Sequence, residues 1–127
     1  MSSLKFERVK RDNPGLAAFL DRLLGYLRTQ LAAGQTVFIP KLAAAYLHLN
    51  DGEAFVLLEI LAQAGLIERV YNVYCRRNHL LLATVTDVHA LDKVPHCDEC
   101  DADHDISELR VEVAFRLKDR GLVDEGA

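Results

Sequence analysis

Hydrophobic residues recur every three or four positions over residues 14–33, which is the spacing of an amphipathic helix. Asn13 can cap this helix with Pro14 at its first position, and Gly34 is well placed to end it. The apolar stripe consists of Leu16, Phe19, Leu20, Leu23, Leu24, Leu27 and Leu31. Residues 1–13 are charged and show no clear period, so we expect a flexible or partly ordered N-terminus there.

A short strand and a second helix are predicted next. Residues 36–39 are β-prone and stop at Pro40, which suits the first turn of a helix. We expect that helix over residues 41–49. Its buried face is predicted to carry Leu42, Ala45, Tyr46 and Leu49.

A third helix and a further strand follow. Asn50 or Asp51 can cap a helix over residues 53–64, and Gly65 is suited to end it. The buried stripe of this helix is predicted to be Ala54, Leu57, Leu58 and Leu61. Residues 66–74 then alternate between apolar and polar side chains, which predicts a strand.

This order of elements is that of a winged helix-turn-helix. Residues 41–67, KLAAAYLHLNDGEAFVLLEILAQAGLI, resemble the helix-turn-helix portion of winged-helix proteins. The resemblance covers roughly residues 16–75. It implies an N-terminal winged-helix domain over residues 14–74, with three helices and a small β-wing.

The tip of the third helix bears on DNA binding. In helix-turn-helix proteins the second helix of the motif inserts its N-terminal end into the major groove. Here that end carries Asp51 and Glu53, and Asn50 is the only nearby residue of the types that read bases. The two carboxylates would approach DNA phosphates, so DNA reading by this helix is disfavoured.

Residues 75–104 contain all three cysteines and four of the five histidines. Cys75 and His79 form one pair, and Cys97 and Cys100 form a Cys-x2-Cys pair. Thiolate and imidazole suit zinc, and two such pairs supply the ligand count of a closed structural site. We predict a structural Zn²⁺ held by these four residues. His104 is the alternate to His79, because Cys100-x3-His104 is also a workable spacing.

The segments around these ligands are predicted to be strands. Residues 80–86 are β-branched and apolar, and residues 109–118 alternate strictly. The predicted buried face of the second segment is Leu109, Val111, Val113, Phe115 and Leu117. Residues 70–118 thus resemble a zinc ribbon, although the Cys75/His79 pair departs from that family's usual Cys-x2-Cys. The expected fold is therefore α+β, with a zinc-ribbon-like antiparallel sheet over residues 75–118 and a tail over residues 119–127.

Three other interpretations of the thiols are weaker. The cysteines could be unliganded beside solvated histidines, but the third cysteine and the flanking strands favour metal. A redox Cys-x2-Cys needs a lowered thiol pKa, whereas the five acids between residues 98 and 105 would raise it. A catalytic zinc needs an open position, which a four-ligand set does not leave. We therefore expect no enzymatic activity.

Charge and hydropathy limit the cellular location that we expect for this protein. Residues 1–72 hold eight basic and seven acidic side chains, whereas residues 73–127 hold seven basic and twelve acidic ones. No run of about 18 apolar residues occurs, so we expect no membrane span. The first residues lack the apolar segment of a secretion signal, so we expect a reducing, cytoplasmic location.

These features lead to two functional hypotheses. The first is a non-enzymatic adaptor that docks onto protein partners in a multi-component system. A winged helix fused to a zinc ribbon is similar to subunits of transcription initiation factors, such as the alpha subunit of general transcription factor E, and to small bacterial accessory proteins. The alternative is a winged-helix DNA-binding transcriptional regulator. Its support is a set of basic residues that could line a wing: Lys5, Arg8, Lys10, Arg11, Lys41, Arg69, Arg76 and Arg77.

Overall fold

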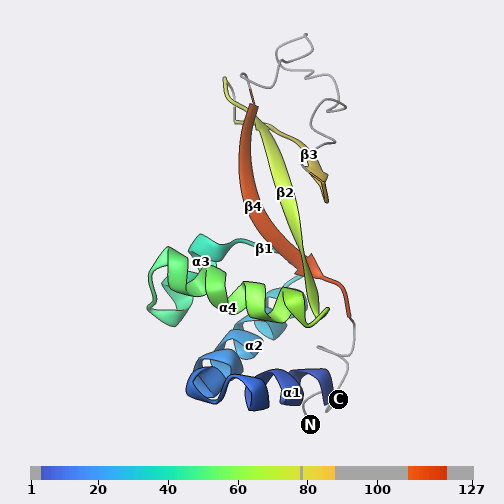
Figure 1. Ribbon diagram of the computed structural model, residues 1–127. Helices are drawn as coiled ribbons and strands as arrows, with labels where there is room; N and C mark the ends of the chain where they lie inside the picture. The colour runs from blue at the N-terminus through green and yellow to red at the C-terminus, as the bar shows by residue number, and fades with distance from the viewer. Residues whose placement is uncertain (1–3, 78, 88–108, 120–127) are drawn as a thin grey trace. The chain divides into compact units, whose positions relative to one another are not determined.

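The computed structural model describes residues 4–77, 79–87 and 109–119 (Figure 1). Within these residues, four α-helices and four strands form an α+β fold, which confirms the predicted class. The strands make one antiparallel sheet in the order β1-β4-β2-β3. No helix in the described part of the chain is long and apolar enough to cross a membrane.

The chain divides into two compact units, which we call the helical unit and the sheet unit. The helical unit comprises Met1–Glu68 and Phe115–Ala127, and the sheet unit comprises Arg69–Ala114. The division differs from the boundary expected between residues 74 and 75. It also assigns the C-terminal end of the predicted ribbon, from Phe115 onward, to the helical unit.

Helix α1, Leu4–Asp12, occupies most of the segment that we expected to be flexible or partly ordered. Phe6 and Val9 lie one turn apart and are both buried, and α1 contacts α2 and α4. Two buried residues are too few to give a periodic signal in the sequence. This helix therefore depends on tertiary packing more than on its own pattern.

Asn13 ends α1, and the prediction that its side chain caps the following helix is wrong. Its backbone N–H donates to the carbonyl of Val9 over 3.1 Å, and its Nδ2 donates to the same oxygen over 2.9 Å. No cap hydrogen bond runs from its side chain to the next helix. The reason is that its side-chain amide is turned back onto the Val9 carbonyl at the end of α1.

The single helix predicted over residues 14–33 is a short 3₁₀ turn, Pro14–Leu16, followed by α2, Ala17–Ala32. The buried residues of α2 are Leu20, Leu23, Leu24, Tyr26 and Leu27. Gly34 has a φ of 87° and follows the helix, as predicted. The N–H of Gln35 donates to the carbonyl of Gln30 over 2.9 Å, which completes a Schellman motif.

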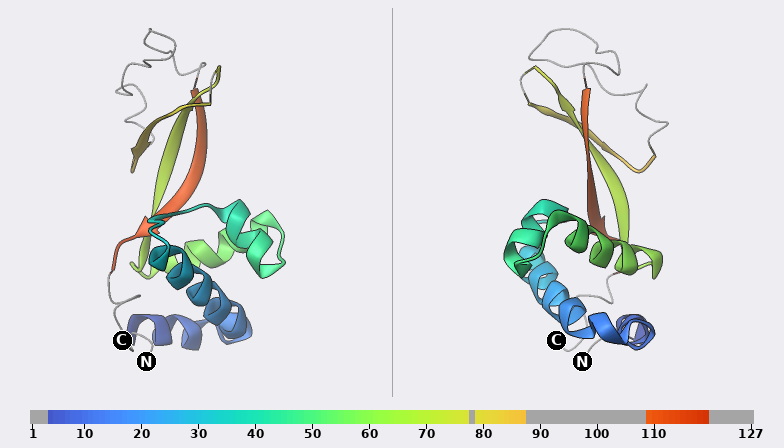
Figure 2. Two further views of the ribbon diagram at one scale, coloured as in Figure 1. Left: turned by 180° about the vertical axis from the view of Figure 1, so that it is seen from behind. Right: turned by 60° about the vertical axis from the view of Figure 1, so that its left-hand side comes forward.

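Strand β1, Val37–Phe38, leads into α3, Pro40–Leu47, and the predicted buried face of this helix is wrong. The buried residues are Ala43, Ala44 and Leu47, whereas Leu42 and Tyr46 are each 55% exposed. The alanines face α2 and α4, because small side chains let helices approach closely. Both views of Figure 2 show the helices of this unit lying against one another.

Helix α4, Asp51–Gln63, begins with a complete capping box. The Oδ1 of Asn50 accepts from the N–H of Glu53 over 2.8 Å, and Glu53 Oε1 accepts from the N–H of Asn50 over 3.0 Å. Of the two predicted caps, Asn50 is therefore the one used. The buried residues are those predicted, Ala54, Leu57, Leu58 and Leu61.

Replacement of Asn50 by alanine should lower the free energy of unfolding by about 1 kcal/mol, because the N–H of Glu53 loses its acceptor. Asn50→Asp keeps an acceptor at the same position and should stay within a few tenths of wild type, on the order of experimental error. Urea denaturation followed by circular dichroism measures both. An Asn50→Ala midpoint equal to that of Asn50→Asp would show that the capping box contributes nothing.

The remaining strands are β2, Ile67–Cys75, β3, Leu81–Val85, and β4, Leu109–Leu117. Strands β2 and β3 form an antiparallel hairpin. The predicted one-sided burial of β4 is only partly realised, since Val111 is 39% exposed while the neighbours Ala114 and Phe115 are both buried. Adjacent residues of a strand point to opposite faces, so both faces are covered at that point.

Phe115 belongs to the core of the helical unit. It is directly opposite Phe38 of β1 in the strand register, and its ring lies 5.8 Å from that of Phe55 in an edge-to-face arrangement. Phe38 and Phe115 are both fully buried. The last part of β4 is therefore a structural element of the helical unit.

Candidate functional site

Cys75 and His79, two of the predicted zinc ligands, lie in the turn that joins β2 to β3. The N–H of His79 donates to the carbonyl of Cys75 over 2.8 Å, and the N–H of Cys75 donates to the carbonyl of Leu80 over 2.8 Å. Cys75 is completely buried, whereas His79 is exposed and has a φ of 61°. A left-handed residue other than glycine is uncommon, and here it turns the chain back toward β3.

The other half of the predicted site, Cys97, Cys100 and the alternate ligand His104, lies outside the described residues. Within residues 4–77, 79–87 and 109–119, no three His, Cys, Asp or Glu side chains are grouped to hold a metal ion. The donor chemistry of the turn fits zinc, because a thiol and an imidazole are two of the four ligands that a structural site needs. The complete ligand set remains a prediction.

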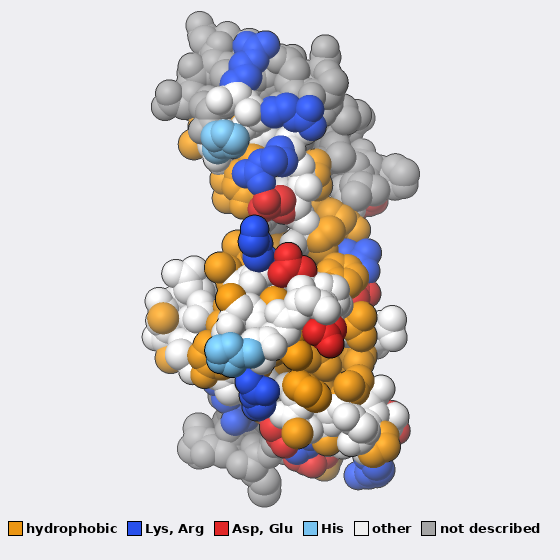
Figure 3. All heavy atoms as spheres, turned by 90° about the vertical axis from the view of Figure 1, so that its left-hand side faces the viewer, with side chains coloured by type: hydrophobic (Ala, Val, Ile, Leu, Met, Phe, Trp, Pro, Cys, Tyr) orange, Lys and Arg blue, Asp and Glu red, His pale blue; other side chains and the backbone are white. Residues whose placement is uncertain are grey.

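Three arginines lie in or near the β2–β3 turn and on the paired strand β4. Arg76 and Arg77 are exposed in the same turn as His79. The guanidinium of Arg110 lies 4.5 Å from the centre of the Tyr74 ring and also pairs with Glu112. Figure 3 shows basic side chains on the face of the sheet unit that it draws. A cation stacked on an aromatic ring is held in place, so Arg110 is a fixed charge on this sheet.

The tip of α4 is acidic and exposed, as the sequence predicted. Asp51 and Glu53 are both exposed, and Asn50 has its side-chain oxygen engaged in the capping box. Carboxylates are favourable at a helix N-terminus because they interact with the positive end of the helix dipole. Stabilisation of the helix N-terminus is therefore sufficient to explain why Asp51 and Glu53 are acidic, and no bound ligand is needed.

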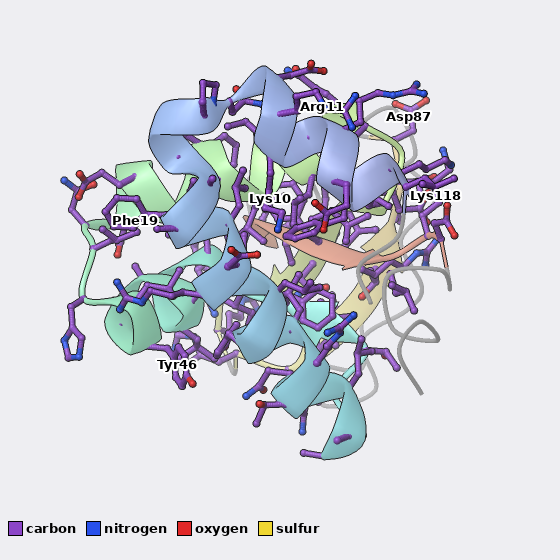
Figure 4. All side chains as sticks on the ribbon, turned by 90° about the horizontal axis from the view of Figure 1, so that it is seen from below. Lys10, Arg11, Phe19, Tyr46, Asp87 and Lys118 are labelled. Atoms are coloured by element: carbon purple, nitrogen blue, oxygen red, sulfur yellow. The ribbon has the colours of Figure 1, made fainter. Side chains whose placement is uncertain are left out.

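The two lysines of α1 are paired with neighbouring carboxylates. Lys5 pairs with Asp119 over 2.9 Å, and Lys10 pairs with Asp21 over 3.0 Å and with Glu7 over 3.4 Å. The hydrogen bond that Lys10 donates to the Asp21 carboxylate raises the pKa of Lys10 above its usual value, so its ammonium stays charged and paired. In Figure 4, Lys10 lies between α1 and α2, whereas Arg11 is on the outer side of α1.

An apolar groove of about 200 Å³ lies beside the tip of α4. Its walls come from the start of α2, the α3–α4 connection and α4, and its lining residues are Leu16, Phe19, Leu49, Glu53, Val56 and Leu57. Figure 3 shows hydrophobic side chains gathered on the helical unit next to acidic ones. The volume is below the roughly 300–1,000 Å³ of small-molecule pockets, so one or two side chains of a protein fit it better.

The groove could not be found from the sequence. The helical period placed Leu16 and Phe19 on the buried stripe, whereas Phe19 is 36% exposed and Leu16 is only half-buried. Val56, outside the predicted stripe of α4, is 53% exposed. A pattern gives the direction of a side chain around its helix but does not show where the neighbouring helix stops covering it.

Comparison of the chain with protein families, with curated proteins and with solved structures gives no match.

Proposed function

We propose that this protein is a non-enzymatic adaptor that docks onto other proteins of a larger assembly. Its helical part would serve as a winged-helix module, and residues 75–118 would form a ribbon held by a structural zinc. The element order α2-β1-α3-α4-β2 supports the winged-helix assignment, since it is the order expected for that fold. The Cys75–His79 turn between two antiparallel strands supports the ribbon.

The observation that carries the proposal is the exposed acidic tip of α4. A helix that reads the major groove brings its N-terminal residues to base edges and phosphates. In this chain those residues are Asp51 and Glu53, with the capping box holding Glu53 in place. Bringing these carboxylates close to DNA phosphates would place like charges together across the interface, which costs on the order of several kcal/mol. A partner with a neutral or basic protein surface meets no such repulsion.

The pairing of the α1 lysines also argues against the DNA-binding alternative. Lys5 and Lys10 already have carboxylate partners, so binding of phosphate would have to displace Asp119 and Asp21. Phosphate neutralisation supplies most of the affinity of a nucleic-acid-binding protein. The basic cluster seen in the sequence is therefore a weaker phosphate site than its composition indicates.

A titration of the protein with labelled mixed-sequence duplex DNA at low salt should show no salt-sensitive binding in fluorescence polarisation. The double variant Asp51→Asn, Glu53→Gln keeps hydrogen-bond acceptors at both positions and removes both charges. If the carboxylates are what repels DNA, this variant should bind more tightly than wild type.

Tight wild-type binding that falls steeply with added salt would overturn the proposal in favour of a DNA-binding regulator. Two double variants would then show which part of the protein contacts the phosphates. One combines Arg76→Ala with Arg77→Ala in the sheet unit, and the other combines Arg8→Ala with Arg11→Ala in α1. Each lost phosphate contact should lower the slope of log affinity against log salt concentration by about one.

A further inference from the structure

The helical unit carries a second exposed apolar surface, which we call the α3 ridge. It consists of Leu42 and Tyr46, one turn apart on α3, together with the neighbouring Lys41. Leu42 and Tyr46 are each 55% exposed, although their side chains are among the largest on this helix. The Tyr46 ring is held against the buried Tyr26, with ring centroids 4.9 Å apart. The ridge is thus a fixed apolar projection flanked by a positive charge.

The ridge and the groove beside α4 are complementary. The groove is apolar and concave, with Glu53 among its lining residues and Asp51 at the same helix tip. The ridge is apolar and exposed, and the exposed Lys41 directly precedes Leu42 in the chain. Aromatic and aliphatic anchors that fill a pocket, surrounded by opposite charges, are the usual centre of a protein interface.

A segment of the same chain is a poorer occupant of the groove. Residues 120–127 and residues 88–108 both contain more acidic than basic side chains, and they would bring like charge to Glu53. A surface with apolar and basic character complements both the apolar lining and the carboxylate of Glu53. The α3 ridge has both, and a second copy of the chain supplies one.

We propose that the protein self-associates, with the α3 ridge of one copy seated in the apolar groove of a second copy. Figure 4 shows Phe19 of the groove and Tyr46 of the ridge at the same end of the helical unit. Two copies can therefore exchange ridges, and the expected product is a dimer with two equivalent contacts. Lys41 of each copy lies beside Glu53 of the other.

Sedimentation velocity over a wide range of protein concentrations tests the dimer. Leu42→Glu places a negative charge on the ridge, and Val56→Arg places a positive charge in the groove. Both residues are more than half exposed, so both variants should fold with unchanged circular dichroism. Each substitution should raise the dimer dissociation constant by about tenfold or more, the effect of losing a central anchor of an interface.

Mixing the two variants gives the sharper result. The Val56→Arg copy keeps a native ridge and the Leu42→Glu copy keeps a native groove, so one native contact forms in each mixed pair. An equimolar mixture should associate more tightly than either variant does alone. Leu4→Glu changes a residue that is 88% exposed on α1, outside both surfaces, and should leave association unchanged.

A wild-type protein that stays monomeric at every concentration would overturn the inference, as would folded Leu42→Glu and Val56→Arg variants that associate like wild type. Neither result bears on the adaptor function, which the DNA titration tests separately. If the wild-type protein stays monomeric and does not bind DNA, the occupant of the groove would be a different protein.

Discussion

Removal of the proposed structural zinc is expected to unfold the sheet unit and to leave the helices of the helical unit folded. The buried apolar residues of the described sheet unit are few and mostly small: Val70, Val73, Cys75, Leu109 and Ala114. Such a core contributes little against the conformational entropy of ordering the chain. Structural zinc sites contribute roughly 10–16 kcal/mol of apparent binding free energy, which is folding free energy when the site does not exist in the unfolded chain.

Hydrogen exchange before and after exhaustive chelation measures this effect directly. Amides of residues 69–77 and 109–114 should lose protection, while those of α2 and α4 should keep it and far-UV helical signal should change little. Cys97→Ser and Cys100→Ser should each reproduce the loss. Unchanged protection in both units after complete metal removal would contradict a structural zinc.

The metal content of two histidine variants decides the fourth ligand. His79→Ala should abolish stoichiometric zinc if His79 is the ligand, and His104→Ala should do so if His104 is. His79 lies in the turn with Cys75, but its side chain is exposed, so its placement alone does not choose between them. Metal content of the two purified variants, measured side by side, gives the answer.

Phe115→Ala should destabilise the helical unit by about 3–5 kcal/mol, the cost of removing a fully buried aromatic side chain. The phenylalanine ring contacts Phe55 and is opposite Phe38 in the strand register. Its loss would leave a cavity between β1, β4 and α4. A destabilisation of this size is a large fraction of the stability of a small domain.

Urea denaturation followed at the helical signal measures the loss, and Val111→Ala on the same strand is the matched control. Val111 is 39% exposed, so its truncation should cost about 1 kcal/mol or less. If Phe115→Ala changes the helical transition no more than Val111→Ala does, the end of β4 contributes nothing to the helical core.

Local signals in the sequence were sufficient for most element bounds. The capping box at Asn50 and the glycines at 34 and 65 each act through neighbours within a few residues. Such interactions are the same in an isolated segment as in the folded protein, so a pattern can show them. The backbone hydrogen bond from the N–H of His79 to the carbonyl of Cys75 is local in the same sense.

Burial depends on what packs against an element, and here the pattern was less informative. The period of α3 allowed two apolar faces, and packing of Ala43 and Ala44 against neighbouring helices chose between them. That choice left Leu42 and Tyr46 exposed and so produced the α3 ridge. The stability of helix α1 likewise depends on the burial of Phe6 and Val9 in the core.

By itself the sequence determined the α+β class, the cap at Asn50 and the positions of the strands, and it predicted a set of zinc ligands that remains a proposal. Tertiary structure alone decided which face of α3 is buried and that residues 4–12 form a helix. It also decided that Phe115 packs in the helical core and that the groove exists. The physical reason is that hydrophobic burial is a property of surfaces brought together from distant parts of the chain, and no single segment contains that information.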